Sequence, residues 1–355
     1  MTRAALFIAI LLIGASAQAQ EFYAGKTISI LVNYGAGGNA DTDARLLAKH
    51  WARHIPGHPT IIIQNAPGAG GLRAINVLGK KAGVDTTGLN VGFFTVNPVS
   101  PLVEDPALQV SMTKDLIPIG GTSGWTIAYG RTDIQPGLKR PEDIVKAKKV
   151  FVGGYSKGSS HDARLKLALD VLGVEFSPVT GFPGQNDVLK AFLQNEVNLS
   201  ASSLPAYLSL VVPNAITPGI GMSLWHYDLI GADGQTEGSA ELSQNGIPRL
   251  SELYRRIHGV EPKGDTFDAL LHLNNLGARL QRGVFLPRGT PQEAVIALQT
   301  GYENVLRDPA FIADYEKVNN EKPEGINARG VEQVLQAMQR VPQSVRTVLK
   351  QATAE

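Results

Sequence analysis

One pattern recurs along the chain: an apolar, β-branched run, then a glycine-rich turn, then apolar residues at helical spacing. The run at 26–34 (KTISILVNY) predicts a buried strand, which ends at the glycines of 35–39 before a helix begins. Residues 60–80 repeat this unit, and 90–95 (NVGFFT) predict a third strand. Strands that alternate with helices indicate an α/β fold with mainly parallel strands and right-handed crossovers.

A second series of the same units lies inside the first. A strand at 149–153 leads into the loop 154–160 and then into a helix that runs to Leu172. Further strands are predicted at 176–180 and 197–201. The chain therefore contains two β-loop-α series, one inserted in the other.

Two linkers are predicted to join the series. We interpret 115–126, which is rich in proline and glycine, as the crossing into the inner series, and 231–246 as the return. We therefore predict two lobes, each a mixed, mainly parallel sheet flanked by helices. Lobe 1 is formed by 20–122 and 231–355, and lobe 2 is formed by 123–230.

The glycine turns are candidate anion sites. A helix N-terminus has unpaired backbone N–H groups and partial positive charge, and glycine lets a ligand approach closely. The turns Gly35–Asn39 and Gly68–Gly71 follow strand ends, at the edge of an α/β sheet where ligands bind. Ser156–Ser160 adds hydroxyl donors from the other lobe. Asp41 and Asp43 are expected to cap the following helix, and Asp41 also to bond loop amides.

Residues 1–19 have the pattern of a cleaved signal peptide, with Arg3, an apolar run at 4–13 and A-x-A cleavage sites. That run is too short to span about 30 Å of hydrocarbon. The chain has no cysteine, and its formal net charge of +1 gives no reason to expect nucleic acid or an anionic membrane as partner. We expect a soluble, monomeric periplasmic protein.

A dinucleotide site is a competing interpretation of the first turn. Gly35, Gly37 and Ala40 match the fingerprint G-x-G-x-x-[GA]. The second strand, however, ends in Gln64-Asn65, where an acidic residue would hold the ribose. We therefore expect no nucleotide cofactor.

A secreted serine hydrolase is an alternative that stays open. Gly154 to Gly158 match G-x-S-x-G between a strand and a helix, which is the setting of a nucleophile elbow with Ser156. Against it, Lys157-Gly158 delay the helix. His50 and His54 lie four residues apart on a predicted helix, but the glutamate of H-E-x-x-H is absent. We interpret them as a solvated helix face and expect no metal site.

The glycine blocks resemble those of the Bug family, the TctC-like substrate-binding proteins of tripartite tricarboxylate transporters. The matching blocks are spread over nearly the whole mature chain. The blocks that carry the resemblance are Tyr23–Ile28, Tyr34–Asp41, Asn65–Gly71, Gly158–His161, Gly181–Gly184 and Pro287–Pro291.

The resemblance implies a two-lobed periplasmic binding protein fold of type II. Such a protein closes on a small organic carboxylate without catalysis and delivers it to the permease of a tripartite tricarboxylate transporter. A sensor that presents its closed lobes to a membrane kinase stays open as a second alternative. The residues implied to bind the ligand are Tyr34, Ala36, Gly37, Gly38, Asn39, Asp41, Gly68, Ala69, Gly70, Thr95, Tyr155, Ser156, Ser159, Ser160, Asn186 and Asp187. Arg73, Arg131 and Arg164 are expected at the surface, so the charge of the ligand's far end stays open.

Overall fold

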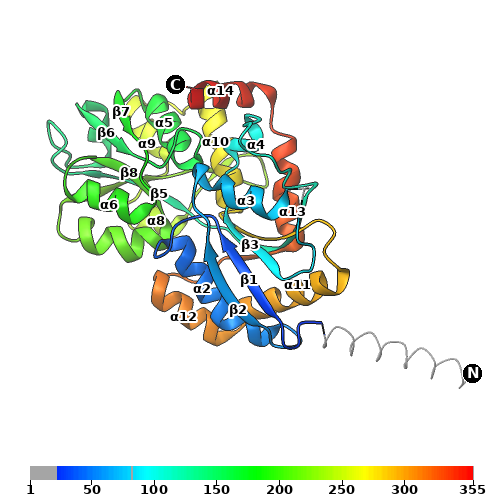
Figure 1. The fold of residues 1–355 in the computed structure, drawn as a ribbon. Coiled ribbons are helices and arrows are strands. Elements are labelled where there is room, and N and C mark those ends of the chain that lie inside the picture. Colours follow the sequence, from blue (N-terminus) through cyan, green and yellow to red (C-terminus); the bar gives the residue numbers. More distant parts are fainter. Residues whose placement is uncertain (1–21, 81–82, 355) are drawn as a thin grey trace, which may run out of the picture.

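The computed structural model of the chain describes residues 22–80 and 83–354. The predicted signal peptide at 1–19 lies outside the described residues. Within them, the strands form a six-stranded, a five-stranded and a two-stranded sheet, and helices cover the faces of the two larger sheets (Figure 1). The predicted two-lobed α/β fold with a mixed sheet in each lobe is confirmed. The expectation that the strands are mainly parallel is wrong, because β12 (Arg282–Pro287) and β13 (Gly325–Asn327) pair antiparallel in the six-stranded sheet and β5 (Thr126–Arg131) pairs antiparallel with both of its neighbours in the five-stranded sheet.

The first sheet is built from two distant parts of the chain. Its strands are β1 (Thr27–Val32), β2 (Thr60–Asn65), β3 (Asn90–Thr95), β4 (Leu116–Thr122), β12 (Arg282–Pro287) and β13 (Gly325–Asn327), in the order β13-β4-β12-β3-β1-β2. Strand β1 pairs in parallel with β2 and β3, whereas β12 runs antiparallel between β3 and β4. The register pairs Arg282 with Thr95. A late strand thus brings a cation to the edge where the early strands end.

The second sheet is formed by one continuous stretch of chain. Its strands are β5 (Thr126–Arg131), β6 (Val150–Gly153), β7 (Phe176–Val179), β8 (Leu199–Ser203) and β9 (Gly221–His226), in the order β7-β6-β8-β5-β9. Strand β6 is parallel to β7 and β8, and β5 is antiparallel to β8 and β9. The chain enters this sheet through 123–125, directly after β4.

Helices cover both faces of the first sheet (Figure 1). Those on one face are α2 (Asn39–Trp51), α11 (Gln292–Leu306) and α12 (Pro309–Asn319), and those on the other are α3 (Leu72–Gly79) and α13 (Ala328–Gln339). Side chains alternate between the faces of a strand, so Val91 and Phe93 pack in the cluster of α2 and α11, while Phe94 packs in that of α3.

The second sheet is covered by α5 (Ser160–Leu172) on one face and by α6 (Gln185–Leu193) and the π-helix η4 (Tyr207–Ile216) on the other. Helix α10 (Asp265–Arg279) packs against α5 and against the C-terminal helix α14 (Gln343–Ala354). As a result, Leu165 of α5, Leu273 of α10 and Leu335 of α13 belong to one continuous apolar core. The remaining elements are η1 (Ala52–His54), η2 (Ala69–Gly71), α4 (Val99–Leu102), η3 (Pro141–Lys146), α7 (Leu204–Ala206), β10 (Leu229–Ile230), β11 (Thr236–Glu237), α8 (Ala240–Gln244) and α9 (Leu250–His258).

Two predicted linkers contain regular structure. The stretch 115–126 contains β4, because Gly120 and Gly121 leave room for the ring of Tyr302 and for the backbone of β12. The stretch 231–246 contains β11 and α8. The predicted lobe boundaries stay a prediction; α9 contacts β9 and η3, beside the second sheet.

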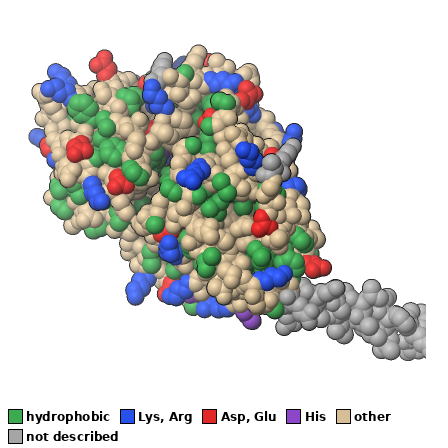
Figure 2. All heavy atoms as spheres, in the orientation of Figure 1, with side chains coloured by type: hydrophobic (Ala, Val, Ile, Leu, Met, Phe, Trp, Pro, Cys, Tyr) green, Lys and Arg blue, Asp and Glu red, His purple; other side chains and the backbone are tan. Residues whose placement is uncertain are grey.

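On the face shown in Figure 2, basic and acidic side chains are interspersed, so this face has no large patch of one charge. Among the described residues, no helix has the length and apolar character needed to cross a membrane.

Candidate functional site

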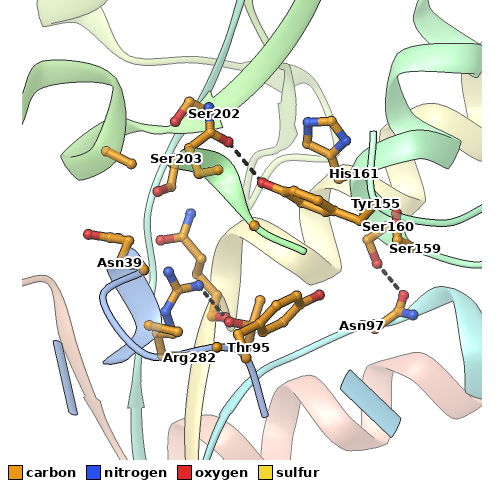
Figure 3. A pocket seen from close by; sticks show the side chains of 18 of the residues that line it. Asn39, Thr95, Asn97, Tyr155, Ser159, Ser160, His161, Ser202, Ser203 and Arg282 are labelled. Carbon is orange, nitrogen blue, oxygen red and sulfur yellow. Dashed lines mark hydrogen bonds between the residues drawn. The ribbon is translucent and has the colours of Figure 1, made fainter. Parts of the chain in front are cut away.

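A cavity of about 220 Å³ lies between the two lobes, at the edge where β1, β3 and β6 end (Figure 3). Thr95 and Arg282 lie across it from Ser202 and Ser203. The lining residues from the first lobe and α10 are Tyr34, Gly35, Ala36, Gly38, Asn39, Ala40, Thr95, Val96, Asn97, Gly277, Gln281 and Arg282. Those from the second lobe are Thr126, Tyr155, Ser159, Ser160, His161, Arg164, Pro183, Gly184, Gln185, Asn186, Asp187, Ser202, Ser203 and Ala206.

Three helices begin at the wall of this cavity. Helix α2 begins at Asn39, α5 at Ser160 and α6 at Gln185, and all three residues line the space. The first N–H groups of a helix lack intrahelical partners, and the helix dipole adds partial positive charge at the same end. Because three such ends meet at one cavity, it favours a negatively charged group.

The loop before α2 is held by the buried carboxylate of Asp41. This carboxylate accepts hydrogen bonds from the backbone N–H of Gly37 at 2.9 Å, Nδ2 of Asn65 at 3.0 Å and Nε of Arg45 at 2.9 Å. Although burial alone would raise the pKa of Asp41, these bonds hold it below its ordinary value. The expected bond to a loop amide is confirmed. The expected capping role is wrong, because the N-cap residue is Gly38.

An arginine that the sequence did not single out lines the cavity from the first lobe. Arg282 is buried, its Nε lies 3.5 Å from Oδ2 of Asp43, and its Nη1 donates to the Gln281 carbonyl at 3.4 Å. Burial raises the pKa of Asp43, although Arg282 beside it acts in the opposite direction. The Asp43 carboxylate also accepts from Nδ2 of Asn39 at 3.4 Å, so this pair is joined to the first turn of α2.

A second arginine lines the cavity from the other lobe. Arg164 lies on α5, and its guanidinium carbon is 5.8 Å from the centre of the Tyr227 ring. The expectation that Arg164 is a surface residue is wrong, because its side chain lies between α5, Tyr227 and the cavity. Arg73 is exposed as expected, and neither it nor Arg131 lines the cavity.

The remaining polar groups of the wall are mainly neutral donors. The Tyr155 hydroxyl donates to Oε1 of Gln185 at 2.8 Å, and the Tyr34 hydroxyl donates to the Gly70 carbonyl at 3.4 Å. Burial raises the pKa of Tyr34 to about 12 and the pKa of Tyr155 well above its ordinary value. Both phenols therefore stay protonated at neutral pH.

The structure brings most of the predicted ligand-binding residues to the cavity and leaves a group of them outside it. Those that line it are Tyr34, Ala36, Gly38, Asn39, Thr95, Tyr155, Ser159, Ser160, Asn186 and Asp187. Those outside are Gly37, Asp41, Gly68, Ala69, Gly70 and Ser156. The second glycine turn lies behind Tyr34, and a Cβ on Gly70 would be 3.1 Å from Oγ of Ser156. The second glycine turn therefore borders a contact between the lobes.

The sequence reasoning missed several lining residues. Ser202 and Ser203 end β8, and this polar pair directly after the predicted strand 197–201 was a usable signal. Asn97 offered no comparable signal, whereas His161 lies in the block Gly158–His161 that carries the family resemblance. Arg282 opens a strand whose central place in the sheet was not predicted, so no local pattern marked it.

The structure gives little support to two interpretations that rested on single motifs, a nucleophilic Ser156 and a solvated helix face at His50. Ser156 lies outside the cavity, and its hydroxyl bonds no histidine or carboxylate of the described residues. Helix α5 begins only at Ser160. The expectation of a solvated face at His50 is wrong, because His50 is buried with Nε2 2.8 Å from Oδ2 of Asp314.

The two lobes contact each other beside the cavity. Nδ2 of Asn97 donates to the Gly158 carbonyl at 2.8 Å, and Nδ2 of Asn186 donates to the Gly37 carbonyl at 3.2 Å. The hydroxyl of Ser160 donates to Oδ1 of Asn97 at 2.5 Å. The walls of the cavity are thus joined across the lobes by neutral hydrogen bonds.

Comparison with known proteins adds one curated relative. The UPF0065 protein in the TAR-I ttuE-ttuC' intergenic region of Agrobacterium vitis is 27% identical over 205 residues. The match spans 55% of this chain and 57% of that relative, so it covers little more than half of the relative's length. No family model matches the chain.

Solved structures match almost the whole chain. The periplasmic binding protein BugD has a TM-score of 0.65 at 17% identity, covering 94% of this chain and 99% of BugD. The chain has the Bug-type periplasmic binding protein fold. BugD bears the name of the family that the glycine blocks resemble.

Two further structures of the Bug-type fold were solved with ligands. MatC from Rhodopseudomonas palustris with bound malate has a TM-score of 0.63 at 18% identity, covering 93% of this chain and 99% of MatC. Rpa4515 from R. palustris with adipate has a TM-score of 0.67 at 19% identity, covering 93% of this chain and 98% of Rpa4515.

Proposed function

We propose that the chain is a periplasmic solute-binding protein of the Bug family that captures a small organic carboxylate and delivers it to a tripartite tricarboxylate transporter-type permease. The observation that carries this proposal is the cavity between the lobes at which α2, α5 and α6 begin. Malate in MatC and adipate in Rpa4515 support a carboxylate as the ligand of this fold.

The proposed mechanism is reversible capture. A carboxylate entering between separated lobes accepts hydrogen bonds from the N–H groups of Gly35, Ala36 and Gly38, which line the cavity, and from those of the helix ends. The lobes then close, and bonds such as that from Asn97 to Gly158 hold them together. A ligand that binds the closed form better shifts the population toward it, and the permease recognises that form. No bond of the ligand is broken, so the role needs neither a catalytic residue nor a cofactor.

A thermal-shift screen of mono-, di- and tricarboxylates tests the proposal. A carboxylate at about 100 times its dissociation constant should stabilise the protein by about 2.7 kcal/mol and raise its melting temperature. Small-angle scattering of the same samples should show a smaller radius of gyration as the lobes close. The matching amides serve as controls and should leave both quantities unchanged. If no carboxylate in the panel shifts melting, the proposed ligand class is wrong.

A further inference from the structure

Arg164 is held at the cavity wall by neutral groups. Its Nε donates to the Ser160 carbonyl at 3.2 Å, and its Nη1 donates to Oγ1 of Thr126 at 3.3 Å and to Oδ1 of Asn274 at 3.2 Å. These bonds come from α5, β5 and α10, so they fix the direction of the guanidinium. Its Nη2 makes no hydrogen bond to the described residues.

No carboxylate of the described residues lies within 4.0 Å of Arg164. Asp162, two residues earlier, is engaged by the backbone N–H of Tyr155 and by the hydroxyl of Ser159. Asp228, whose carbonyl accepts from Asn274, bonds Ser251 and lies 3.9 Å from Arg249. Oδ1 of Asp162 and the carboxylate of Asp228 are thus engaged elsewhere. Oδ2 of Asp162 is buried without a hydrogen-bond partner, but neither it nor Asp187 of the cavity wall lies within 4.0 Å of Arg164.

Arg164 is half-buried beside the cavity, so its charge is partly withdrawn from water. Burial lowers its pKa, which means that the enclosure disfavours the charged form. A buried charge ordinarily has a partner of opposite sign. Arg282, on the opposite lobe, has such a partner in Asp43 at 3.5 Å. Arg164 is thus a cavity-lining cation whose partner the described chain does not supply.

We propose that Arg164 is a second anion-binding position, which makes the cavity selective for dicarboxylates over monocarboxylates. This inference rests on the proposed function. One carboxylate binds at the N-terminus of α2, near Arg282, and the other binds the free Nη2 of Arg164 on the second lobe. A dicarboxylate thereby joins the two lobes, whereas a monocarboxylate leaves Arg164 without a counter-charge.

The test compares succinate, glutarate and adipate with butyrate, pentanoate and hexanoate, which have the same chain lengths and one carboxylate fewer. Calorimetric titration of the wild-type protein should show at least one dicarboxylate binding about 10- to 100-fold more tightly than its monocarboxylate counterpart. Arg164→Gln should remove most of this preference by weakening the dicarboxylate and sparing the monocarboxylate. Arg255→Gln, at an exposed ion pair on α9, is the matched control and should keep the preference.

Melting of the ligand-free variants separates a binding role from a structural one. Because Arg164 has no ionic partner, Arg164→Gln should melt at the wild-type temperature or above it. The inference is overturned if the wild type binds dicarboxylates and monocarboxylates equally, or if Arg164→Gln weakens the binding of both equally. In either case carboxylate binding is still observed, and the proposed function stands. Wild-type protein that binds neither class would overturn the proposed function and this inference together.

Discussion

Glu321 is a carboxyl group whose ionisation the fold opposes. It follows the C-cap of α12 and is partly buried. Burial, with smaller contributions from the charges of Glu324, Asp43 and Glu241, raises the pKa of Glu321 to about 8. In an unfolded chain the same group ionises near pH 4.5. The folded protein therefore holds a proton at neutral pH that the unfolded chain releases.

This difference predicts how Glu321→Gln changes stability with pH. The wild type loses stability as pH rises from about 4.5 to 8, because only the unfolded chain gains the charge freely. Glutamine does not ionise, so the variant should nearly match the wild type at pH 4. At pH 8.5 its free energy of unfolding should exceed that of the wild type by roughly 1–3 kcal/mol, a range that is reduced because Glu321 is partly exposed. Urea unfolding at both pH values measures this. Glu316→Gln on the exposed side of α12 is the control, and an equal gain there would contradict the assignment.

At the scale of single residues, the sequence predicted the anion loop better than the cations. The loop at 35–39 can be predicted from its own residues, because glycines that follow an apolar run indicate a turn at the end of a strand. Arg164 and Arg282 carry no such local mark, since an arginine is most often exposed. Their burial depends on helix packing and on a register between β12 and β3 that a single sequence does not encode locally.

Among the structural elements, the second glycine turn serves the contact between the lobes. Gly70 has φ +61° and lies against Ser156 of the other lobe without lining the cavity. Gly70→Val should therefore weaken capture of the tightest-binding carboxylate of the panel by roughly 3- to 30-fold, because its methyl groups hold the lobes apart. It should also lower the melting temperature, because valine is strained at this φ in open and closed forms alike.

Ser156→Gly in the Gly70→Val background separates these two effects. Removing the hydroxymethyl group makes room between the lobes, so affinity should recover while the lower melting temperature remains. Gly234→Val is the control for strain alone, because Gly234 has φ +79° with open space around its Cβ position. Affinity that stays low in the double variant would count against a steric contact between the lobes.

The strand predictions succeeded for the apolar runs of β1 and β3 and failed for β4, which contains two consecutive glycines. The span predicted for β3 is the one observed, and β1 differs from its predicted span only at its ends. Strand β4 was interpreted as a linker, since Gly120 and Gly121 are poor strand formers. They stand there because Tyr302 and β12 occupy the space of their side chains, and that packing involves residues more than 150 positions away.

At the scale of the whole molecule, the lobes share one apolar core. Leu165, Leu273 and Leu335 belong to it, and α10 joins α5 to α14. The protein should therefore unfold in one calorimetric transition, with a van't Hoff enthalpy close to the measured enthalpy. Scanning calorimetry checks this. Two resolved transitions, or a bound carboxylate that raises the melting of only part of the protein, would show that the lobes unfold independently.

The central position of β12 in the first sheet makes ligand binding depend on the C-terminal part of the chain. The second sheet uses residues 126–226 without interruption, so its strands can pair without the C-terminal part. The first sheet has a gap between β3 and β4 until Arg282–Pro287 is inserted. A chain truncated before this strand can therefore have a complete second sheet and still lack one wall of the cavity, so the ability to hold a ligand is the last property that folding completes.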